Sequence, residues 1–171
     1  MERKKLALIT GASQGLGACM ARRLAELGFR IKVYEVIQDL VVNYAHSAEK
    51  AEVVAAKIRK AGGDAIAMRC DVSNENAVIS LFKELEEKFG GVDVLVNNAR
   101  VDPMSRRPDE TDGMWWDHVL SIGLRGAYLC SNEFAKYAEH HRNGRIVNLS
   151  SARAHRPNEL EAIAYSTSKL A

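Results

Sequence analysis

The chain has 171 residues, of which 47% are hydrophobic and 27% are charged, and its formal net charge is +2. These values are ordinary for a globular domain with its own core, and so balanced a charge gives no electrostatic reason to expect nucleic acid or a membrane as a partner. Cys19, Cys70 and Cys130 show no zinc-binding or Cys-x-x-Cys spacing, so we expect buried thiols in a reducing cytoplasm and no metal site.

Apolar runs alternate with amphipathic segments along the first half of the chain. Residues 5–10, KLALIT, predict a buried strand, and a Gly-rich turn leads from it into a helix that should end at Gly28. Two strand-like pieces follow, RIKVYEV at 30–36 and LVVNY at 40–44, and one of them should be the second strand. An amphipathic helix, the strand AIAMRC and a further helix come next.

In the second half, VDVLVNN at 92–98 predicts a strand, and a loop beginning at Arg100 leads to a long helical stretch that reaches His141. RIVNLSS at 145–151 predicts the last strand, and AIAYSTSKLA opens a final helix. Strands that alternate with helices are typical of βαβ units, so we predict an α/β fold in which helices cover both faces of a doubly wound parallel sheet. We expect one domain over residues 1–171.

The turn TGASQGLG after the first strand is the first sign of a binding site. Gly11, Gly15 and Gly17 let the backbone turn tightly and approach a pyrophosphate, whose charge the helix N-terminus favours. A glycine-rich turn alone could be a plain connection between a strand and a helix. The strand–turn–helix context favours dinucleotide binding instead.

Five motifs occur in a fixed order: TGASQGLG, CDV at 70–72, NNA at 97–99, RIVNLSS, and YSTSK at 165–169. Through them the sequence, from about residue 5 to its end, resembles the classical short-chain dehydrogenase/reductase family. The resemblance implies a Rossmann-type sheet that binds NAD or NADP. It also implies the cofactor-binding residues Gly11, Ser13, Gln14, Gly15, Leu16, Gly17, Asp71, Val72, Asn98, Ala99, Tyr165 and Lys169.

Within that implied site, Asp71 and Val72 would lie beside the adenine, and Asn98 beside the ribose on the nicotinamide side. Each residue also has a structural interpretation. Asp71 could be an ordinary loop acid, and Asn97 and Asn98 could cap the fourth strand. For Asn97 we favour the structural interpretation.

The choice between NAD and NADP depends on which piece is the second strand. Rossmann folds often place an acid about 20 residues after the glycines, where it bonds the ribose 2′-hydroxyl of NAD. Glu35 fits if RIKVYEV is the strand, and the helix-to-strand spacing slightly favours this assignment and NAD. If LVVNY is the strand, Asn43, Tyr44 and Ala45 lie at its tip, and Ser47 is available to the 2′-phosphate of NADP.

Tyr165 and Lys169 share one helical face, four residues apart. A nearby ammonium favours the phenolate and lowers the tyrosine pKa towards the working range, which suits proton transfer to a carbonyl while a nicotinamide moves a hydride. The resemblance adds that Lys169 bonds the nicotinamide ribose and that Ser151 holds the substrate oxygen. Ser150 is the competing serine, although Ser151 matches the family pattern better.

Three departures from the family pattern weigh against activity. Arg100 stands where relatives have glycine, and Gly123 stands where they have an asparagine that completes a proton relay. The chain also ends two residues after Lys169, whereas the family continues with further strands and helices. We therefore expect a fragment or truncated relative that lacks the C-terminal strands, leaves RIVNLSS at a sheet edge and tends to form homo-oligomers.

Two functions from different classes follow from these observations. The first is an NAD(P)-dependent oxidoreductase, perhaps similar to the 3-oxoacyl-ACP reductases, acting on a small-molecule carbonyl/alcohol pair. The second is a dinucleotide-binding remnant or interaction domain without catalysis. The motifs do not separate the two, because a remnant would inherit them as well.

Overall fold

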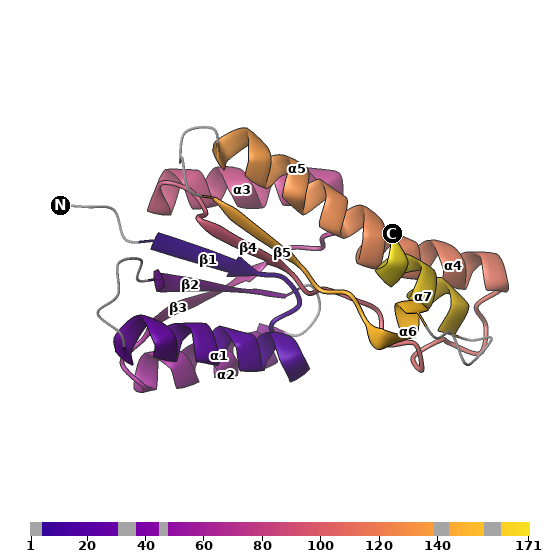
Figure 1. Ribbon diagram of the computed structural model, residues 1–171, viewed down its shortest axis with the longest axis horizontal. Helices are drawn as coiled ribbons and strands as arrows, with labels where there is room; N and C mark the ends of the chain where they lie inside the picture. The colour runs from indigo at the N-terminus through magenta and orange to yellow at the C-terminus, as the bar shows by residue number, and fades with distance from the viewer. Residues whose placement is uncertain (1–4, 31–36, 45–47, 139–143, 156–161) are drawn as a thin grey trace.

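A five-stranded parallel sheet forms the centre of the molecule in the computed structural model (Figure 1). The structure describes residues 5–30, 37–44, 48–138, 144–155 and 162–171. The strands are β1 (Lys5–Ile9), β2 (Ile37–Tyr44), β3 (Asp64–Arg69), β4 (Val94–Asn97) and β5 (Arg145–Asn148). Their order is β3-β2-β1-β4-β5, so the chain builds outwards from β1 and then crosses to β4. Sheets of this kind bind ligands where the order reverses, here beside the carboxyl ends of β1 and β4.

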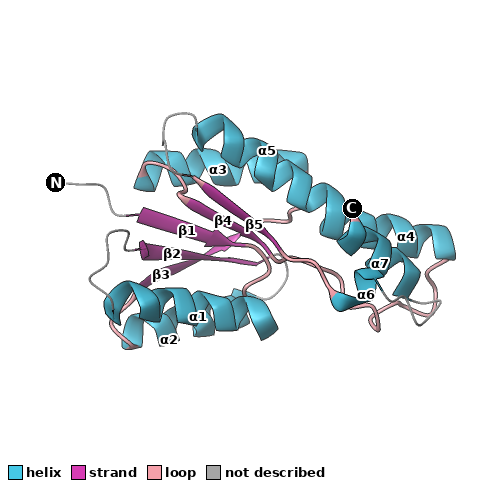
Figure 2. Ribbon diagram, in the orientation of Figure 1, coloured by secondary structure: helices cyan, strands magenta, loops and turns pink. Residues whose placement is uncertain are grey.

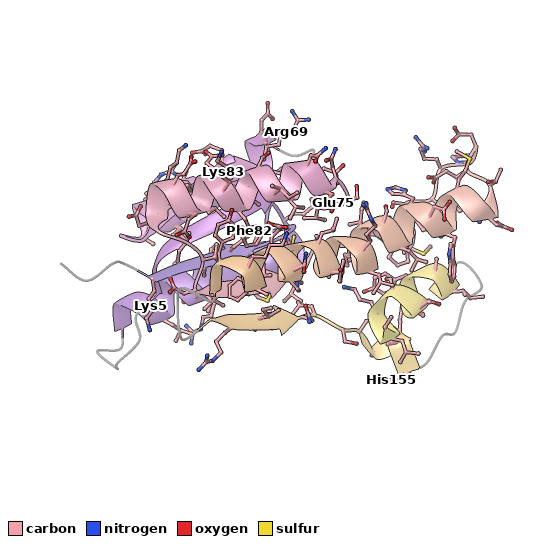
Figure 3. All side chains as sticks on the ribbon, turned by 90° about the horizontal axis from the view of Figure 1, so that it is seen from above. Lys5, Arg69, Glu75, Phe82, Lys83 and His155 are labelled. Atoms are coloured by element: carbon pink, nitrogen blue, oxygen red, sulfur yellow. The ribbon has the colours of Figure 1, made fainter. Side chains whose placement is uncertain are left out.

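Helices cover both faces of this sheet, which confirms the predicted doubly wound α/β fold. The four that do so are α1 (Gly15–Arg30), α2 (Ala48–Lys60), α3 (Glu75–Phe89) and α5 (Ala127–Ala138). Figure 2 shows α1 and α2 on one face and α3 and α5 on the other. In Figure 3, Phe82 lies between α3 and α5, where its ring stacks on that of Tyr137 at a centroid distance of 6.5 Å.

The strand β1 explains why this part of the sequence is an unbroken apolar run. Leu6 and Leu8 belong to the core on the α3 side, whereas Ala7 and Ile9 belong to the core on the α1 side. All four side chains are at most 1% exposed. Since alternate residues of a strand point to opposite faces, a strand covered on both faces needs apolar residues at every position.

A second group of helices lies beyond the carboxyl ends of the strands (Figure 1). It consists of α4 (Asp112–Leu120), a π-helical turn η1 (Ser121–Gly126), α6 (Ala152–His155) and α7 (Ile163–Leu170). The elements α4, η1 and α5 follow one another without a break, so the long helical stretch is confirmed as far as Ala138. The helix α7 packs against α4, η1 and α6, and His155 marks the end of α6 in Figure 3.

The second strand of the sheet is Ile37–Tyr44, so the assignment that we favoured from the sequence is wrong. Its backbone pairs with β1 on one side and with β3 on the other. A parallel strand between two neighbouring strands favours a continuous apolar run such as Leu-Val-Val, which RIKVYEV lacks. The helix α1 also continues past Gly28 to Arg30 and takes up part of the earlier piece. Glu35 itself lies outside the described residues.

The strand β5 is the outermost strand of the described sheet, as we expected. Its apolar residues Ile146 and Val147 are 40% and 45% exposed. An uncovered apolar edge favours pairing with another chain. The self-association that we expect from it stays a prediction.

The turn η1 and the helix α7 approach each other closely at Gly123. A Cβ atom at this glycine would lie 2.9 Å from Oγ and 3.1 Å from Cβ of Ser168. Any larger side chain would push on the helix that carries Tyr165 and Lys169. Close packing therefore favours glycine at this position, in spite of its cost of ~1 kcal/mol inside a helix.

We expect Gly123→Ala to destabilise the fold by about 1 kcal/mol, because crowding against Ser168 outweighs the gain in helix propensity. Gly113→Ala is the matched control, since a Cβ there meets nothing within 4 Å, and it should stabilise by up to about 1 kcal/mol. Urea unfolding of both variants measures the two effects. Stabilisation of both by the same amount would contradict the packing argument.

A buried carboxylate fastens the loop between β4 and α4. Glu110 is 6% exposed, and its Oε2 accepts a hydrogen bond from the Arg107 backbone N–H at 3.0 Å. Its Oε1 lies 3.2 Å from His118 Nδ1 and 3.5 Å from the Arg107 guanidinium. The backbone hydrogen bond from Arg107 is the main cause that lowers the pKa of Glu110, with His118 and the Arg107 charge adding to it.

We expect Glu110→Gln to lower the melting temperature at pH 7, because the neutral amide keeps the shape but loses the charge that these donors favour. The folded-state pKa lies below the unfolded value of about 4.3, so the stabilisation is complete above that value and is lost as the pH falls through the folded-state pKa. Thermal unfolding by circular dichroism should therefore show the two proteins converging in acid. Asp109→Asn, an exposed neighbour, is the control, and an equal loss in both variants at pH 7 would rule out a special role for Glu110.

Candidate active site

The glycine-rich turn is fastened to the end of β4 by Asn98 and Thr10. The Asn98 side chain donates hydrogen bonds to the carbonyl oxygens of Thr10 at 2.9 Å and of Gly11 at 3.1 Å. The backbone N–H groups of Asn98 and Ala99 both donate to Thr10 Oγ1 at 3.0 Å. These bonds hold β1, β4 and the turn together at the point where the strand order reverses. They give Asn98 a structural role, and its contact with a ribose stays a prediction.

The three glycines of the turn serve different purposes. A Cβ on Gly11 would lie 2.9 Å from Ala99 Cα, and one on Gly17 would lie 2.5 Å from Asn98 Nδ2. Both glycines therefore allow the turn to pack against β4. Gly15 has a positive φ of +57° and nothing within 4 Å of the position of a Cβ, so it faces open space at the N-terminus of α1. A phosphate contact at this glycine stays a prediction.

A cavity of about 370 Å³ lies beside this turn, between α1 and α2. Ser13 and Gln14 of the turn line it, and Gln14 Oε1 accepts a hydrogen bond from Lys50 Nζ at 3.1 Å. Arg22 and Lys57 also line the cavity, so three cations and one acid, Glu49, surround it. The sequence analysis did not single out these basic residues. The signal was present, because Lys50 and Lys57 are two helical turns apart and share one face of α2.

Asp71 and Val72 follow β3 and close the turn into α3. Asp71 Oδ1 accepts hydrogen bonds from the backbone N–H of Ser73 at 2.9 Å and from its hydroxyl at 2.7 Å. The helix is capped by Asn74, whose side chain accepts from the Ala77 N–H. Val72 packs against Gly126, where a Cβ would come within 2.7 Å of Val72 Cγ2. Their contact with an adenine stays a prediction.

The catalytic candidates gather after β5. Lys169 Nζ donates a hydrogen bond to the Leu149 carbonyl oxygen at 2.9 Å, and Ser150 Oγ donates to the Lys169 carbonyl oxygen at 2.8 Å. These two bonds fix the end of α7 to the segment that leaves the sheet. Ser151 Oγ accepts from the Arg153 N–H at 3.3 Å, and this serine immediately precedes α6, which packs beside α7. The structure therefore places Ser151 and Lys169 on neighbouring segments.

Tyr165 is held one helical turn before Lys169, in an apolar cluster. It is 8% exposed and packs with Val101, Trp115, Val119 and Ala164. This packing joins the loop after β4, the helix α4 and the helix α7, so the position of the tyrosine depends on all three. Burial restricts the ring to one environment and keeps bulk water from most of it.

The electrostatics of the site are set by two cations. The Arg100 guanidinium carbon lies 5.9 Å from the centroid of the Tyr165 ring, within the range of a cation–π contact. Burial, and then the charge of Arg100, lower the pKa of Lys169. The residue in the place of the family glycine therefore lies beside the Tyr165 ring and acts electrostatically on Lys169. The sequence marked Arg100 as a departure, but no sequence signal indicated this contact.

Asn97 lies under the site and joins the sheet to α5. Its Nδ2 donates to Asn148 Oδ1 at 2.8 Å, to Ser131 Oγ at 2.9 Å and to the Ala127 carbonyl oxygen at 3.3 Å. These contacts support the structural interpretation that we favoured for Asn97. Within the described ranges, no three His, Cys, Asp or Glu residues are placed to hold a metal ion, and no helix is long and apolar enough to cross a membrane.

Comparisons with known proteins agree with this geometry. The chain is 38% identical over 153 residues to a 3-oxoacyl-acyl-carrier-protein reductase, FabG, of Staphylococcus aureus strain Mu50, covering 88% of this chain and 57% of the relative. It is 36% identical over 148 residues to a 3beta-hydroxysteroid dehydrogenase of Mediterraneibacter gnavus, covering 86% of this chain and 50% of the relative. The chain thus spans little more than half the length of the curated relatives it matches.

Two solved structures share the fold. A metagenomic short-chain oxidoreductase in complex with NADP matches with a TM-score of 0.81 and 31% identity, over 96% of this chain and 70% of that one. A double mutant of a Serratia marcescens short-chain dehydrogenase/reductase matches with a TM-score of 0.78 and 29% identity, over 98% of this chain and 64% of that one. The family model described as short chain dehydrogenase matches residues 5–171. With its five motifs and this sheet order, the chain belongs to the short-chain dehydrogenase family and, by lineage, to the NAD(P)-dependent dehydrogenases and reductases.

Proposed function

We propose that this chain forms the cofactor-binding and proton-transfer part of an oxidoreductase that interconverts a small carbonyl compound and its alcohol. The observation that carries this proposal is the double hydrogen bond between the end of α7 and the segment after β5. It fixes the helix that bears Tyr165 and Lys169 at the same end of the sheet as the open turn at Gly15. A single domain in the cytoplasm is the setting that we continue to expect.

The residues around the turn fit a dinucleotide. Gly15 leaves open space at the N-terminus of a 16-residue helix, where backbone N–H groups and the helix dipole favour a pyrophosphate. The nicotinamide would supply or accept the hydride. In the direction of reduction the carbonyl carbon gains that hydride, and the carbonyl oxygen gains the proton of the Tyr165 hydroxyl.

The chain's own residues then have distinct tasks. The Lys169 ammonium favours the phenolate that Tyr165 becomes when it gives up its proton. The Ser151 hydroxyl would hold the substrate oxygen within reach of that proton. The cluster around Tyr165 excludes water, which strengthens the electrostatic contacts inside the site.

We propose NADP as the cofactor to test first. The argument for NAD required Glu35 at the end of the second strand, and that strand instead ends at Tyr44. No acidic residue occurs between Asn43 and Ala48, and the cavity beside the turn is lined by three cations and one acid. Ser47, the expected partner of a 2′-phosphate, lies outside the described residues, so the proposal depends on Lys50 and its neighbours.

The second candidate function, dinucleotide binding without catalysis, is favoured by one observation. Gly123 stands where the family pattern has an asparagine, and Ser168 occupies the space that a side chain would need. An asparagine could not be accommodated there without a shift of α7. The two functions are separated by measuring hydride transfer and cofactor affinity on the same sample.

We expect Lys50→Gln to weaken NADPH binding about tenfold and to leave NADH binding unchanged, because only NADPH has the 2′-phosphate. Lys60→Gln, a charge change elsewhere on the exposed face of α2, is the matched control. Titration of the nicotinamide fluorescence measures both affinities. A wild-type preference for NADH would overturn the cofactor assignment.

We expect Tyr165→Phe to reduce hydride transfer by about 10²-fold or more while cofactor affinity is retained, because only the proton donor is removed. Tyr128→Phe, on a tyrosine that is 65% exposed, should change neither quantity. Stopped-flow absorbance of the nicotinamide follows the reaction. If wild type binds cofactor but transfers no hydride to a panel of ketones, the second candidate function is correct.

A further inference from the structure

Arg100 is a charged side chain beside the Tyr165 ring that no part of the proposed chemistry uses. Its guanidinium carbon is 5.9 Å from the centroid of the Tyr165 ring, and the residue is exposed. Its Nη1 makes one long hydrogen bond, 3.5 Å, to the Val101 carbonyl oxygen. At that length the bond contributes little. With respect to the described residues, the donors of the guanidinium are thus largely available to a ligand.

The backbone on both sides of Arg100 is fixed. Before it, the Ala99 N–H donates to Thr10 Oγ1 at 3.0 Å, and Ala99 Cα packs on Gly11. After it, Val101 is 7% exposed in the same cluster as Tyr165. The backbone therefore holds the Cα of Arg100 in place, with its charged side chain beside Tyr165.

Other arginines of the same loop are neutralised by carboxylates. Arg106 pairs with Asp112 at 2.6 Å, and Arg107 pairs with Glu110 at 3.5 Å. Among the described residues, Arg100 has no carboxylate within 4 Å and contacts an aromatic ring and a carbonyl instead. It also acts on Lys169 as a like charge, so the pair of cations is electrostatically unfavourable without an anion between or beside them.

We propose that Arg100 determines substrate specificity by binding a carboxylate on the substrate, within a few bonds of the carbonyl that Tyr165 protonates. The planar guanidinium matches a carboxylate in a two-bond geometry, which a lysine or an amide does not provide. An anion at this point would also offset the repulsion between Arg100 and Lys169. The substrate class is then a short oxo-carboxylate, or the hydroxy-carboxylate in the reverse direction. This inference rests on the proposed function, since it places the reacting carbonyl at Tyr165.

The test compares acetoacetate with methyl acetoacetate, which carry the same ketone and differ in the charge. Wild type should have the higher kcat/KM for acetoacetate. Arg100→Gln should lower kcat/KM for acetoacetate about 10- to 100-fold, chiefly by raising KM. Its kcat/KM for methyl acetoacetate should stay within about threefold of the wild-type value. Arg100→Lys should give a kcat/KM for acetoacetate between those of wild type and Arg100→Gln, because it keeps the charge but loses the planar guanidinium. Arg106→Gln, the same charge change in the same loop, is the matched control, and melting temperatures establish that each variant is folded.

A second readout separates this inference from the proposed function. Binding of acetoacetate to the cofactor-loaded chain is followed by saturation-transfer NMR, with and without Arg100→Gln. If the ester is reduced but neither readout depends selectively on Arg100, the proposed function stands and the inference is overturned. If neither probe is reduced but acetoacetate binding still requires Arg100, the anion site stands and the proposed function is overturned. If Arg100→Gln lowers kcat/KM equally for acetoacetate and methyl acetoacetate, Arg100 acts on Tyr165 or the cofactor, and the inference is also overturned.

Discussion

The rest of the site depends on the hydrogen bonds that the Asn98 side chain and the Thr10 hydroxyl make. One amide side chain and one hydroxyl join the end of β1, the end of β4 and the glycine-rich turn. Without them, the two strands that flank the reversal of sheet order would be free to separate at their carboxyl ends. The turn would then lose its shape, and the start of the loop at Arg100 would no longer be held in position.

Much of the fold follows from local sequence signals. The wrong assignment of the second strand shows where such signals are not sufficient. The strand β1 was predicted because burial on both faces requires an unbroken apolar run. The second strand was predicted wrongly because two apolar pieces lie close together, and spacing from the preceding helix was used to choose between them. That helix continues to Arg30, so the spacing argument started from the wrong end point. Only the pairing with β1 and β3 decides the register, and pairing is a property of the whole sheet.

The candidate site likewise contains residues whose positions the sequence predicted and contacts that it did not predict. The positions of Gly15, Ser151, Tyr165 and Lys169 were predictable, because each belongs to a motif that a strand or helix presents at one end of the sheet. The contact of Arg100 with the Tyr165 ring was not predictable, since it joins residues that are 65 positions apart in the chain and depends on the packing of α4 and α7. The same holds for Gly123, whose close approach to Ser168 of α7 had no signal in the sequence.

The hydrogen bond from Lys169 to Leu149 has a consequence for the history of such chains. A lysine that served only in proton transfer would be free to drift once a chain no longer catalysed a reaction. Here the same ammonium also holds α7 to the segment that follows β5, so its replacement would loosen the fold whether or not any substrate is turned over. Selection for a folded protein alone would preserve it. The Tyr-x-x-x-Lys motif can therefore outlast the activity that created it, and its presence in a sequence is a weaker sign of a working enzyme than its chemistry suggests.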